Sequence, residues 1–229
     1  MTVHILYDNQ CVQSSLECGW GFSCLIEGRL LFDTGEAGPA LLKNLKGLDV
    51  APEEIEAVVI SHPHWDHTGG LKALRAILPS VPVYLPEGAA EMFPSPDDLS
   101  GAVWSACSDA TPVGPGVTTG TFFTEYKGEA LPEQGIVLRT AKGTSLITGC
   151  AHPGILRMAQ ATAEAYGGEN LYTLFGGFHL VDMEEDEIRS TFAALKELGF
   201  KRIIATHCSG ETARSVCDYK TGAGDIISL

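Results

Sequence analysis

The chain has 229 residues, of which 45% are apolar and 19% are charged, so it can bury a sizeable core and wholesale disorder is excluded. Fifteen Lys and Arg residues stand against 29 Asp and Glu residues, which leaves a formal net charge of −14 at pH 7. This balance argues against a nucleic-acid or anionic-membrane partner, because both need a dense basic surface. Anionic small molecules stay open as substrates, because a bound metal ion reverses the local field.

The start of the chain and its cysteines predict a cytoplasmic protein. The first eight residues contain no basic segment and no long apolar stretch, so we expect no signal peptide, and no apolar run approaches the roughly 18 residues of a membrane span. The seven cysteines are an odd number without the density of a disulfide scaffold, which predicts reduced thiols. Cys18 and Cys24, with five residues between them, fit no zinc ribbon and are expected to be structural.

The first half of the chain is predicted to hold short strands, tight turns and two helices. The strands are expected at residues 3–7, 22–26, 30–32, 57–60 and 81–85. The helices are expected from Pro39 to Leu48 and from Leu71 to Leu78, with leucines at helical spacing. Residues 86–120 hold five prolines and are predicted to form a long covering loop. Its apolar residues are expected to pack over the active site or against a second subunit: Met92, Phe93, Val103 and Trp104.

The second half repeats the alternation of strands and helices, which predicts helices packed on sheets. Strands are expected at residues 136–139, 145–148, 171–175 and 203–205. The helix after residue 180 is predicted to open with Asp182 and Glu185 as a capping box. Loops beyond strand ends are where α/β proteins place their chemistry. Four of the predicted strands lead into a histidine, namely His62, His152, His179 and His207.

The densest group of candidate ligands is the motif His62-x-His64-x-Asp66-His67. In an extended chain, residues two apart point the same way, so His62, His64 and Asp66 converge and His67 is offset. This spacing predicts two metal sites a few ångströms apart, with His62 and His64 on one metal and Asp66 and His67 on the other. A solvated surface loop would not explain three of the seven histidines within six residues.

The segment from Ser61 to Gly70, SHPHWDHTGG, resembles the signature of the metallo-β-lactamase superfamily. Further motifs fit the same family: FDTG at residues 32–35, TGCAHPG at 148–154, GGFHL at 176–180 and THC at 206–208. The later motifs resemble a narrower branch. That branch includes the archaeal dihydropterin–ribofuranosylaminobenzene 5′-phosphate synthase of methanopterin biosynthesis and many unassigned bacterial relatives.

The resemblance implies a single domain over residues 1–229 with an α/β fold, a four-layer αββα sandwich that holds a pair of metal ions at one edge of its two sheets. His207 matches the final ligand of the second metal, and His152 is the best candidate for the remaining histidine on the first. The implied ions are two divalent metals, zinc first, with iron or manganese as alternatives. The ligands that the resemblance implies within the first motif are His62, His64, Asp66 and His67.

Three residues need separate interpretation. Typical members of the superfamily place a metal-bridging Asp where this chain has Cys150, which either binds a softer metal as a thiolate or is merely buried. His179 either binds metal, shuttles a proton or contacts substrate, or is a hydrogen-bonded residue near a helix start. Asp33 is expected to orient a metal-bound histidine, because an aspartic protease would need a second Asp-Thr-Gly carboxylate to share its proton.

The function that the resemblance implies is that of a metal-dependent hydrolase. A metal-bound hydroxide attacks a phosphoryl or carbonyl centre of a small anionic substrate, Asp66 orients the nucleophile and His179 gives a proton to the leaving group. Three alternatives stay open: a pterin-type synthase that releases diphosphate, an iron-dependent oxidoreductase and a non-catalytic, metal-dependent ligand sensor. A homo-oligomer is a further possibility, and the fold alone does not choose among these functions.

Overall fold

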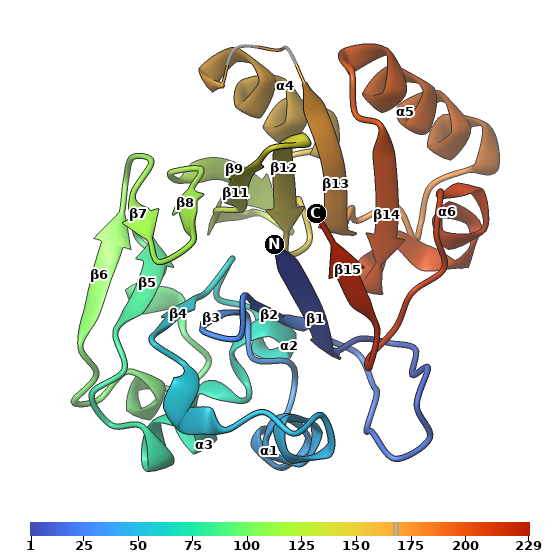
Figure 1. Ribbon diagram of the computed structural model, residues 1–229. Helices are drawn as coiled ribbons and strands as arrows, with labels where there is room; N and C mark the ends of the chain where they lie inside the picture. The colour runs from blue at the N-terminus through green and yellow to red at the C-terminus, as the bar shows by residue number, and fades with distance from the viewer. Residues whose placement is uncertain (167, 169) are drawn as a thin grey trace.

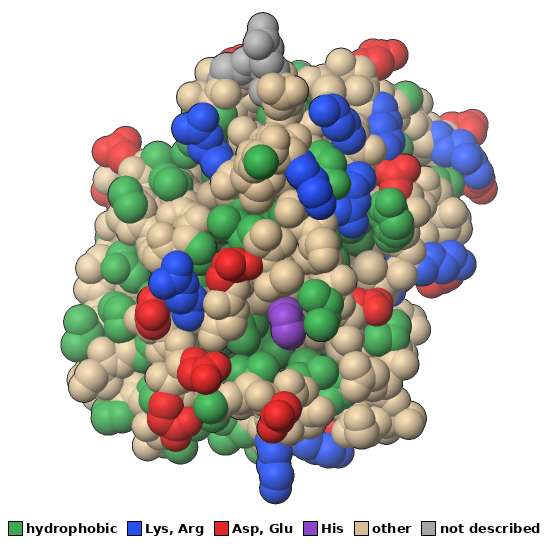
Figure 2. Space-filling view, in the orientation of Figure 1, with side chains coloured by type: hydrophobic (Ala, Val, Ile, Leu, Met, Phe, Trp, Pro, Cys, Tyr) green, Lys and Arg blue, Asp and Glu red, His purple; other side chains and the backbone are tan. Residues whose placement is uncertain are grey.

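The computed structural model describes residues 1–166, 168 and 170–229. Two large sheets face each other and helices cover both outer faces, which gives the four layers expected from the sequence (Figure 1). Within the described residues, no helix combines the length and the apolar character needed to cross a bilayer. On the face drawn in Figure 2, basic side chains gather mainly in the upper half, over the second sheet and its helices, interspersed with acidic ones.

The first sheet has seven strands in the order β15-β1-β2-β3-β4-β5-β6, and its last four strands run parallel. Its outer face is covered by α1 (Gly38–Gly47) and α3 (Leu71–Ile77). The strands are β1 (Thr2–Tyr7), β2 (Ser23–Ile26), β3 (Leu30–Phe32), β4 (Ala57–Val59), β5 (Val83–Pro86), β6 (Trp104–Cys107) and β15 (Ile226–Ser228).

The second sheet has six strands in the order β14-β13-β12-β11-β8-β7, of which β12, β13 and β14 run parallel. Its outer face is covered by α4 (Ile155–Ala165) and α5 (Glu185–Leu198), with α6 (Gly210–Val216) beside them. The strands are β7 (Pro112–Val113), β8 (Gly116–Thr118), β11 (Ile136–Thr140), β12 (Gly143–Thr148), β13 (Leu171–Gly177) and β14 (Arg202–Thr206).

Alternation along the strands explains the layers. On β2, Cys24 and Ile26 belong to the core between the sheets, whereas Leu25 faces the helices of the first sheet. On β14, Ile204 lies between the sheets and Ile203 packs against the outer helices of the second sheet. Because successive side chains of a strand point to opposite faces, each sheet buries both of its faces.

The prediction of a structureless loop over residues 86–120 is wrong, because β6, β7 and β8 lie within it. All three are short, β6 and β7 form the edges of the two sheets with β8 next to β7, and the first three residues of β6 are exposed. Edge strands with solvent-facing residues lack the regular alternation that reveals a strand in a sequence. The sequence also gave no prediction for the hairpin that follows, β9 (Phe122–Tyr126) paired with β10 (Glu129–Glu133).

The apolar residues of this segment divide between different environments. Phe93 is buried in the core under the first sheet's helices, and Met92 lines the pocket described below. Val103 and Trp104 are exposed at the sheet edge. Contact with a second subunit therefore stays a prediction for these two residues only.

The expectation that every cysteine is reduced is wrong for two of them. Cys11 and Cys18 form a disulfide, with 5.7 Å between their Cα atoms, in the loop between β1 and β2. Cys18 is bonded to Cys11 and not associated with Cys24, because the loop returns toward its own start. Cys24 is a buried free thiol in the core, and the cellular compartment stays a prediction.

The capping box of α5 is shifted from its predicted position. Glu184 is the N-cap, and its side chain and that of Glu187 satisfy each other's backbone N–H groups. The prediction of Asp182 and Glu185 is wrong because the turn from Leu180 to Met183 delays the start of the helix. The buried face of the helix consists of Ile188, Phe192 and Leu195.

Candidate metal centre

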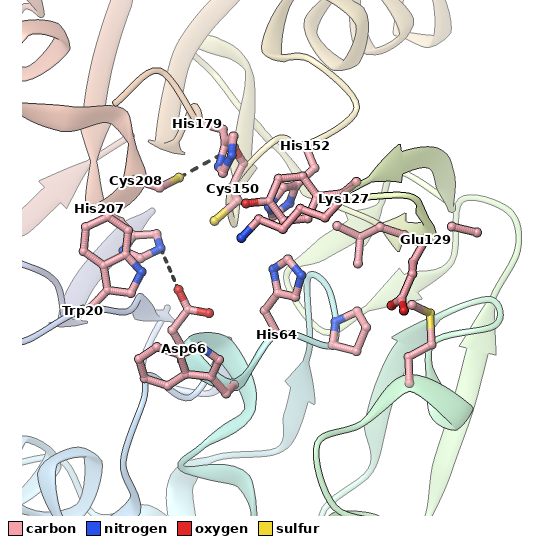
Figure 3. A pocket seen from close by; sticks show the side chains of 16 residues that line it. Trp20, His64, Asp66, Lys127, Glu129, Cys150, His152, His179, His207 and Cys208 are labelled. Carbon is pink, nitrogen blue, oxygen red and sulfur yellow. Dashed lines mark hydrogen bonds and ion pairs between the residues drawn. The ribbon is translucent and has the colours of Figure 1, made fainter. Parts of the chain in front are cut away.

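The carboxyl ends of parallel strands from both sheets meet at one edge of the sandwich, where a pocket of about 490 Å³ opens (Figure 3). The residues after β4 supply the histidine-rich motif, and those after β12 supply Cys150 and His152. The residues after β13 and β14 supply His179 and His207. The four strand ends that the sequence singled out thus converge, as the topology of α/β sheets favours.

Six of the predicted ligands form two groups of three. In each group the candidate ligand atoms all lie within 4.8 Å of one another. We refer to them as the first group, which is His62, His64 and His152, and the second group, which is Asp66, His67 and His207. This division matches the predicted assignment of ligands to two metals, and the ligand roles themselves stay predictions.

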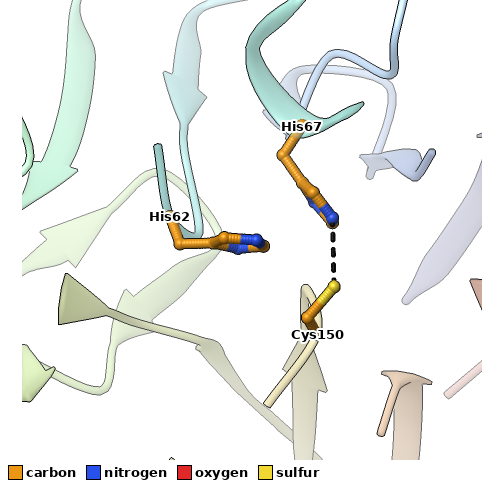
Figure 4. A group of neighbouring side chains, drawn as sticks. All are labelled: His62, His67 and Cys150. Carbon is orange, nitrogen blue, oxygen red and sulfur yellow. Dashed lines mark hydrogen bonds between the residues drawn. The ribbon is translucent and has the colours of Figure 1, made fainter. Parts of the chain in front are cut away.

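Cys150 lies between the two groups. Its Sγ is 3.2 Å from Nε2 of His67, and Cys150, His62 and His67 form a further cluster of candidate ligands (Figure 4). The thiol is buried, yet it also lines the pocket. The position favours the interpretation of Cys150 as a ligand over that of a merely buried residue.

The extended-chain argument for Asp66 is wrong, because Trp65–Thr68 form one helical turn, α2. His64 is its N-cap, with extended backbone, and its carbonyl oxygen accepts hydrogen bonds from the N–H groups of His67 and Thr68. Because the chain turns here, Asp66 and His67 lie next to His207, whereas His62 and His64 lie next to His152. The predicted separation of the motif is correct, but a helical turn produces it rather than strand alternation.

A polar partner holds Nδ1 of four histidines and leaves Nε2 directed into the centre. Ser61 Oγ lies 2.8 Å from His62, and Asp33 Oδ2 lies 2.7 Å from His67. Glu133 Oε2 lies 2.9 Å from His152, and Asn9 Oδ1 lies 2.9 Å from His207. Such outer partners fix the tautomer and orientation of metal-binding imidazoles.

One buried atom provides a direct test of whether the groups suit a metal. Nε2 of His62 is fully buried and has no hydrogen-bond partner among the described residues. A buried polar atom without a partner costs free energy, unless an unseen partner satisfies it. Three imidazoles beside a carboxylate–imidazole group are a donor set that zinc, iron or manganese accepts, so the residues fit a divalent metal pair.

Asp33 contacts a histidine as the sequence predicted, since its buried carboxylate accepts hydrogen bonds from Ser61 N and Oγ and pairs with His67, while metal binding by His67 stays a prediction. Glu133, which the sequence analysis missed, is equally buried. Its carboxylate accepts the N–H groups of Cys150, Ala151 and His152. No sequence spacing connects this Glu to the loop that it holds, because it reaches the loop from β10.

Asp8 and Asn9 were also missed. Asp8 Oδ1 accepts the backbone N–H of His207 at 2.8 Å, and its other oxygen pairs with the buried guanidinium of Arg214 at 3.0 Å. Nearly two hundred residues separate Asp8 from His207. A contact between opposite ends of the chain leaves no local pattern in the sequence.

The electrostatic surroundings divide the histidines into two kinds. Burial, together with neighbouring histidines, holds the pKa of His62 well below its usual range and lowers the pKa of His64 to about 4. Burial also disfavours charge on His67, but the carboxylates of Asp33 and Asp66 outweigh it and raise its pKa to about 9. At neutral pH His62 and His64 therefore offer free lone pairs, whereas a metal that binds His67 must displace a proton.

His179 lies beside Cys208 (Figure 3), its ring is 4.5 Å from that of His152, and with Cys150 and His152 it forms another cluster of candidate ligands. It has a left-handed backbone with φ of 52°, and the hydrogen bond with Cys208 raises its pKa. Because α5 begins only at Glu185, His179 does not cap that helix. Cys208, absent from the predicted site, joins Cys150 and His207 in a further cluster of candidate ligands.

Aromatic side chains from other segments form the outer wall of the pocket. The ring of Trp20 meets that of His207 edge-on at 5.2 Å. The ring of Tyr126, at the tip of β9, packs against His152 at 4.7 Å and against His179 at 5.4 Å. Neither aromatic residue was predicted, because neither belongs to a motif.

Comparison with known proteins agrees with this geometry. The profile of the Metallo-beta-lactamase superfamily matches residues 21–207. The chain is 30% identical to the 7,8-dihydropterin-6-methyl-4-(beta-D-ribofuranosyl)-aminobenzene-5′-phosphate synthase of Methanocaldococcus jannaschii, over 83% of this chain and 79% of that protein.

Solved structures share the fold. The crystal structure of Tm1679, described as a metal-dependent hydrolase of the beta-lactamase superfamily, aligns with a TM-score of 0.83 and 30% identity over 100% of this chain and 99% of that chain. YhfI from Bacillus subtilis, a metallo-beta-lactamase fold protein, aligns with a TM-score of 0.68 and 17% identity over 99% of both chains. The chain belongs to the metallo-beta-lactamase superfamily.

Proposed function

We propose that the chain is a metal-dependent hydrolase that acts at a phosphoryl or carbonyl centre of a small anionic substrate. The observation that carries this proposal is the convergence of the first and second groups at the base of one open pocket, with Nε2 atoms held toward a common centre. The implied cofactors are two divalent ions, zinc first, with iron or manganese as alternatives. When bound, such a pair supplies Lewis acidity and a coordinated water of lowered pKa.

Two side chains of the pocket are proposed to orient the attacking water and to donate a proton. Asp66 Oδ2 lies 3.3 Å from Nε2 of His207 and 3.7 Å from Nε2 of His67, and these histidines hold the pKa of Asp66 low despite its burial. Asp66 therefore stays ionised and orients the attacking water. His179, with a raised pKa, is placed to give a proton to the leaving group.

A second candidate is a synthase that joins two substrates and releases diphosphate. The similarity to the Methanocaldococcus jannaschii synthase over most of the chain favours it. In that reaction the metals would bind the diphosphate leaving group, and no water would attack. A host that makes no methanopterin-type cofactor would exclude that substrate pair.

The hydrolase proposal is tested on protein purified without chelator or affinity-column metal. Metal content is measured by mass spectrometry, followed by turnover on phosphodiester, ester and lactone substrates. We expect about two metals per chain and a loss of turnover in His64→Ala with unchanged folding, because the half-buried His64 serves the first group and supports no core packing. His4→Ala is the control, since His4 lies on β1 outside the pocket.

Two outcomes decide the matter. Turnover that survives in His64→Ala would refute the hydrolase scheme. The same metal count made on Cys150→Ala settles the thiol, because an unchanged count removes Cys150 from the ligands.

A further inference from the structure

The pocket of this acidic protein contains one basic side chain. Among the described residues that line it, Lys127 is the only Lys or Arg, and the lining also includes the carboxylates of Asp66 and Glu129. Lys127 comes from the hairpin of β9 and β10, which the sequence analysis did not identify. Figure 3 shows its side chain extending across the pocket toward the side where Trp20 and His207 lie.

The hairpin turn fixes where this lysine stands. Tyr126 and Glu129 are paired across the ladder, so Lys127 and Gly128 form a two-residue turn, with φ values of 52° and 84°. The ammonium nitrogen lies 5.1 Å from the ring centre of Tyr126, and that ring packs against His152 of the first group. The positive charge is thus one aromatic ring away from the candidate metal ligands.

Neither the turn nor an ion pair accounts for a lysine at this position. In the three-residue turn between β2 and β3, Glu27 and Gly28 also have positive φ values, 51° and 69°, so an acidic residue occupies this backbone conformation elsewhere in the chain. Within the described part of the chain, Lys127 forms no ion pair, although Glu129 is close in sequence. The ammonium is available to a ligand in the pocket.

We propose that Lys127 forms an anion subsite, in which its ammonium binds a phosphate or carboxylate group of the substrate while the reacting centre lies at the first and second groups. The proposal rests on the proposed function for the identity of the reacting centre, but anion binding itself does not require turnover. An ammonium at the mouth of a pocket attracts an anion by a charge-assisted hydrogen bond.

The base of the hairpin fixes the distance between the ammonium of Lys127 and the candidate metal ligands, so the subsite selects substrates by the distance between their anionic group and their reacting bond. Glu133, the last residue of β10, holds the loop that carries Cys150 and His152 through buried hydrogen bonds. The hairpin that bears Lys127 is therefore anchored to the candidate metal ligands at one end and presents the ammonium at the other. A substrate whose anionic group lies at the matching distance from its reacting bond gains both contacts.

Binding of inorganic phosphate to the metal-loaded protein, measured by titration calorimetry, tests the subsite directly. The variants are Lys127→Ala and Lys127→Arg, with Lys142→Ala as a matched control. Lys142 also stands on a two-residue hairpin turn and lies 5.4 Å from the ring of Tyr172, but it does not line the pocket. Acetate is titrated in parallel to separate phosphate from carboxylate recognition.

We expect Lys127→Ala to raise the Kd for phosphate about tenfold, as loss of one charge-assisted contact predicts, and the difference to shrink as salt is added. Lys127→Arg should stay within about threefold of the unaltered protein, and Lys142→Ala should match it. A similar loss for acetate would extend the subsite to carboxylates, and its absence would restrict the subsite to phosphate. An unchanged phosphate Kd in Lys127→Ala would overturn the proposal.

Failure of the proposed function has a different signature. Metal-loaded protein that turns over no ester would refute the hydrolase, while a Lys127-dependent phosphate Kd would still establish the subsite. Conversely, an active hydrolase should show a higher KM in Lys127→Ala for an anionic ester, with kcat and the KM for a neutral ester unchanged. Equal KM values for both esters in the variant would reject the subsite and leave the hydrolase intact.

Discussion

The two walls of the pocket are built differently. The inner wall consists of strand-end residues such as Cys150, His152 and His207, and Glu133 and Asn9 hold Nδ1 of the two histidines. The outer wall consists of Trp20, Tyr126 and Lys127, which belong to a loop and a hairpin, and of these Trp20 and Lys127 are exposed. The difference separates chemistry from selectivity: the geometry of the ligands depends on the sheets, and what reaches them depends on segments that can vary without disturbing the core.

The largest expected effect is that of Glu133→Ala on the inner wall. The change leaves three buried N–H groups and Nδ1 of His152 without their acceptor, which should lower the free energy of unfolding by about 3 to 5 kcal/mol. Metal affinity should fall about 10- to 100-fold. Urea unfolding and metal titration measure the two effects.

Glu133→Gln is the matched control for this prediction. It keeps one carbonyl oxygen as an acceptor, so its losses should be smaller. If Glu133→Ala kept full stability and metal affinity, the inner wall would not depend on this buried carboxylate.

A pH effect of intermediate size is expected in the metal-free protein. The pKa of His67 is about 9 when folded, against an ordinary value of 6.5, so its contribution is fully present below pH 6.5 and is lost as the pH rises through 9. The loss should amount to about 3 kcal/mol of unfolding free energy. Urea unfolding at steps across this range measures it.

This window lies above the titration of His62 and His64, whose lowered pKa values act only at more acidic pH. His67→Gln should remove the contribution of His67 and leave that of His179, whose pKa is also raised. A flat profile for the unaltered protein would show that Asp33 and Asp66 do not hold a proton on His67.

The smallest effect should come from Trp20→Ala on the outer wall. Trp20 is 45% exposed and makes one edge-on contact with His207. Its loss should cost about 1 kcal/mol of stability and change metal affinity by less than about threefold. A loss of metal affinity as large as in Glu133→Ala would show that the outer wall also holds the ligands, and would end the distinction between the two walls.

The sequence was informative wherever one short segment contains the chemistry. The motif from His62 to His67 and the histidines after β12, β13 and β14 were visible because ligands of these types follow buried strands directly. The positions of α1 and α3 followed from their apolar spacing. The four layers came from the family resemblance, which no periodicity alone would have supplied.

The sequence did not predict the residues whose roles depend on contacts between distant segments of the chain. Asn9 and Glu133 orient histidines that lie far away in the chain, and Lys127 enters the pocket only because a hairpin folds over it. The edge strands within residues 86–120 escaped because exposed residues interrupt their alternation. The helical turn at Asp66 replaced the expected extended chain, although its outcome for the ligands was the same.

The disulfide between Cys11 and Cys18 has a practical consequence for handling the protein. It closes the loop that carries Asn9 and Trp20 to His207, so the loop is cross-linked next to the second group. Thiol reductants added to protect Cys150 would also open this cross-link. Metal reconstitution with and without reductant therefore changes two things at once: whether the loop is cross-linked and whether the thiol of Cys150 is reduced.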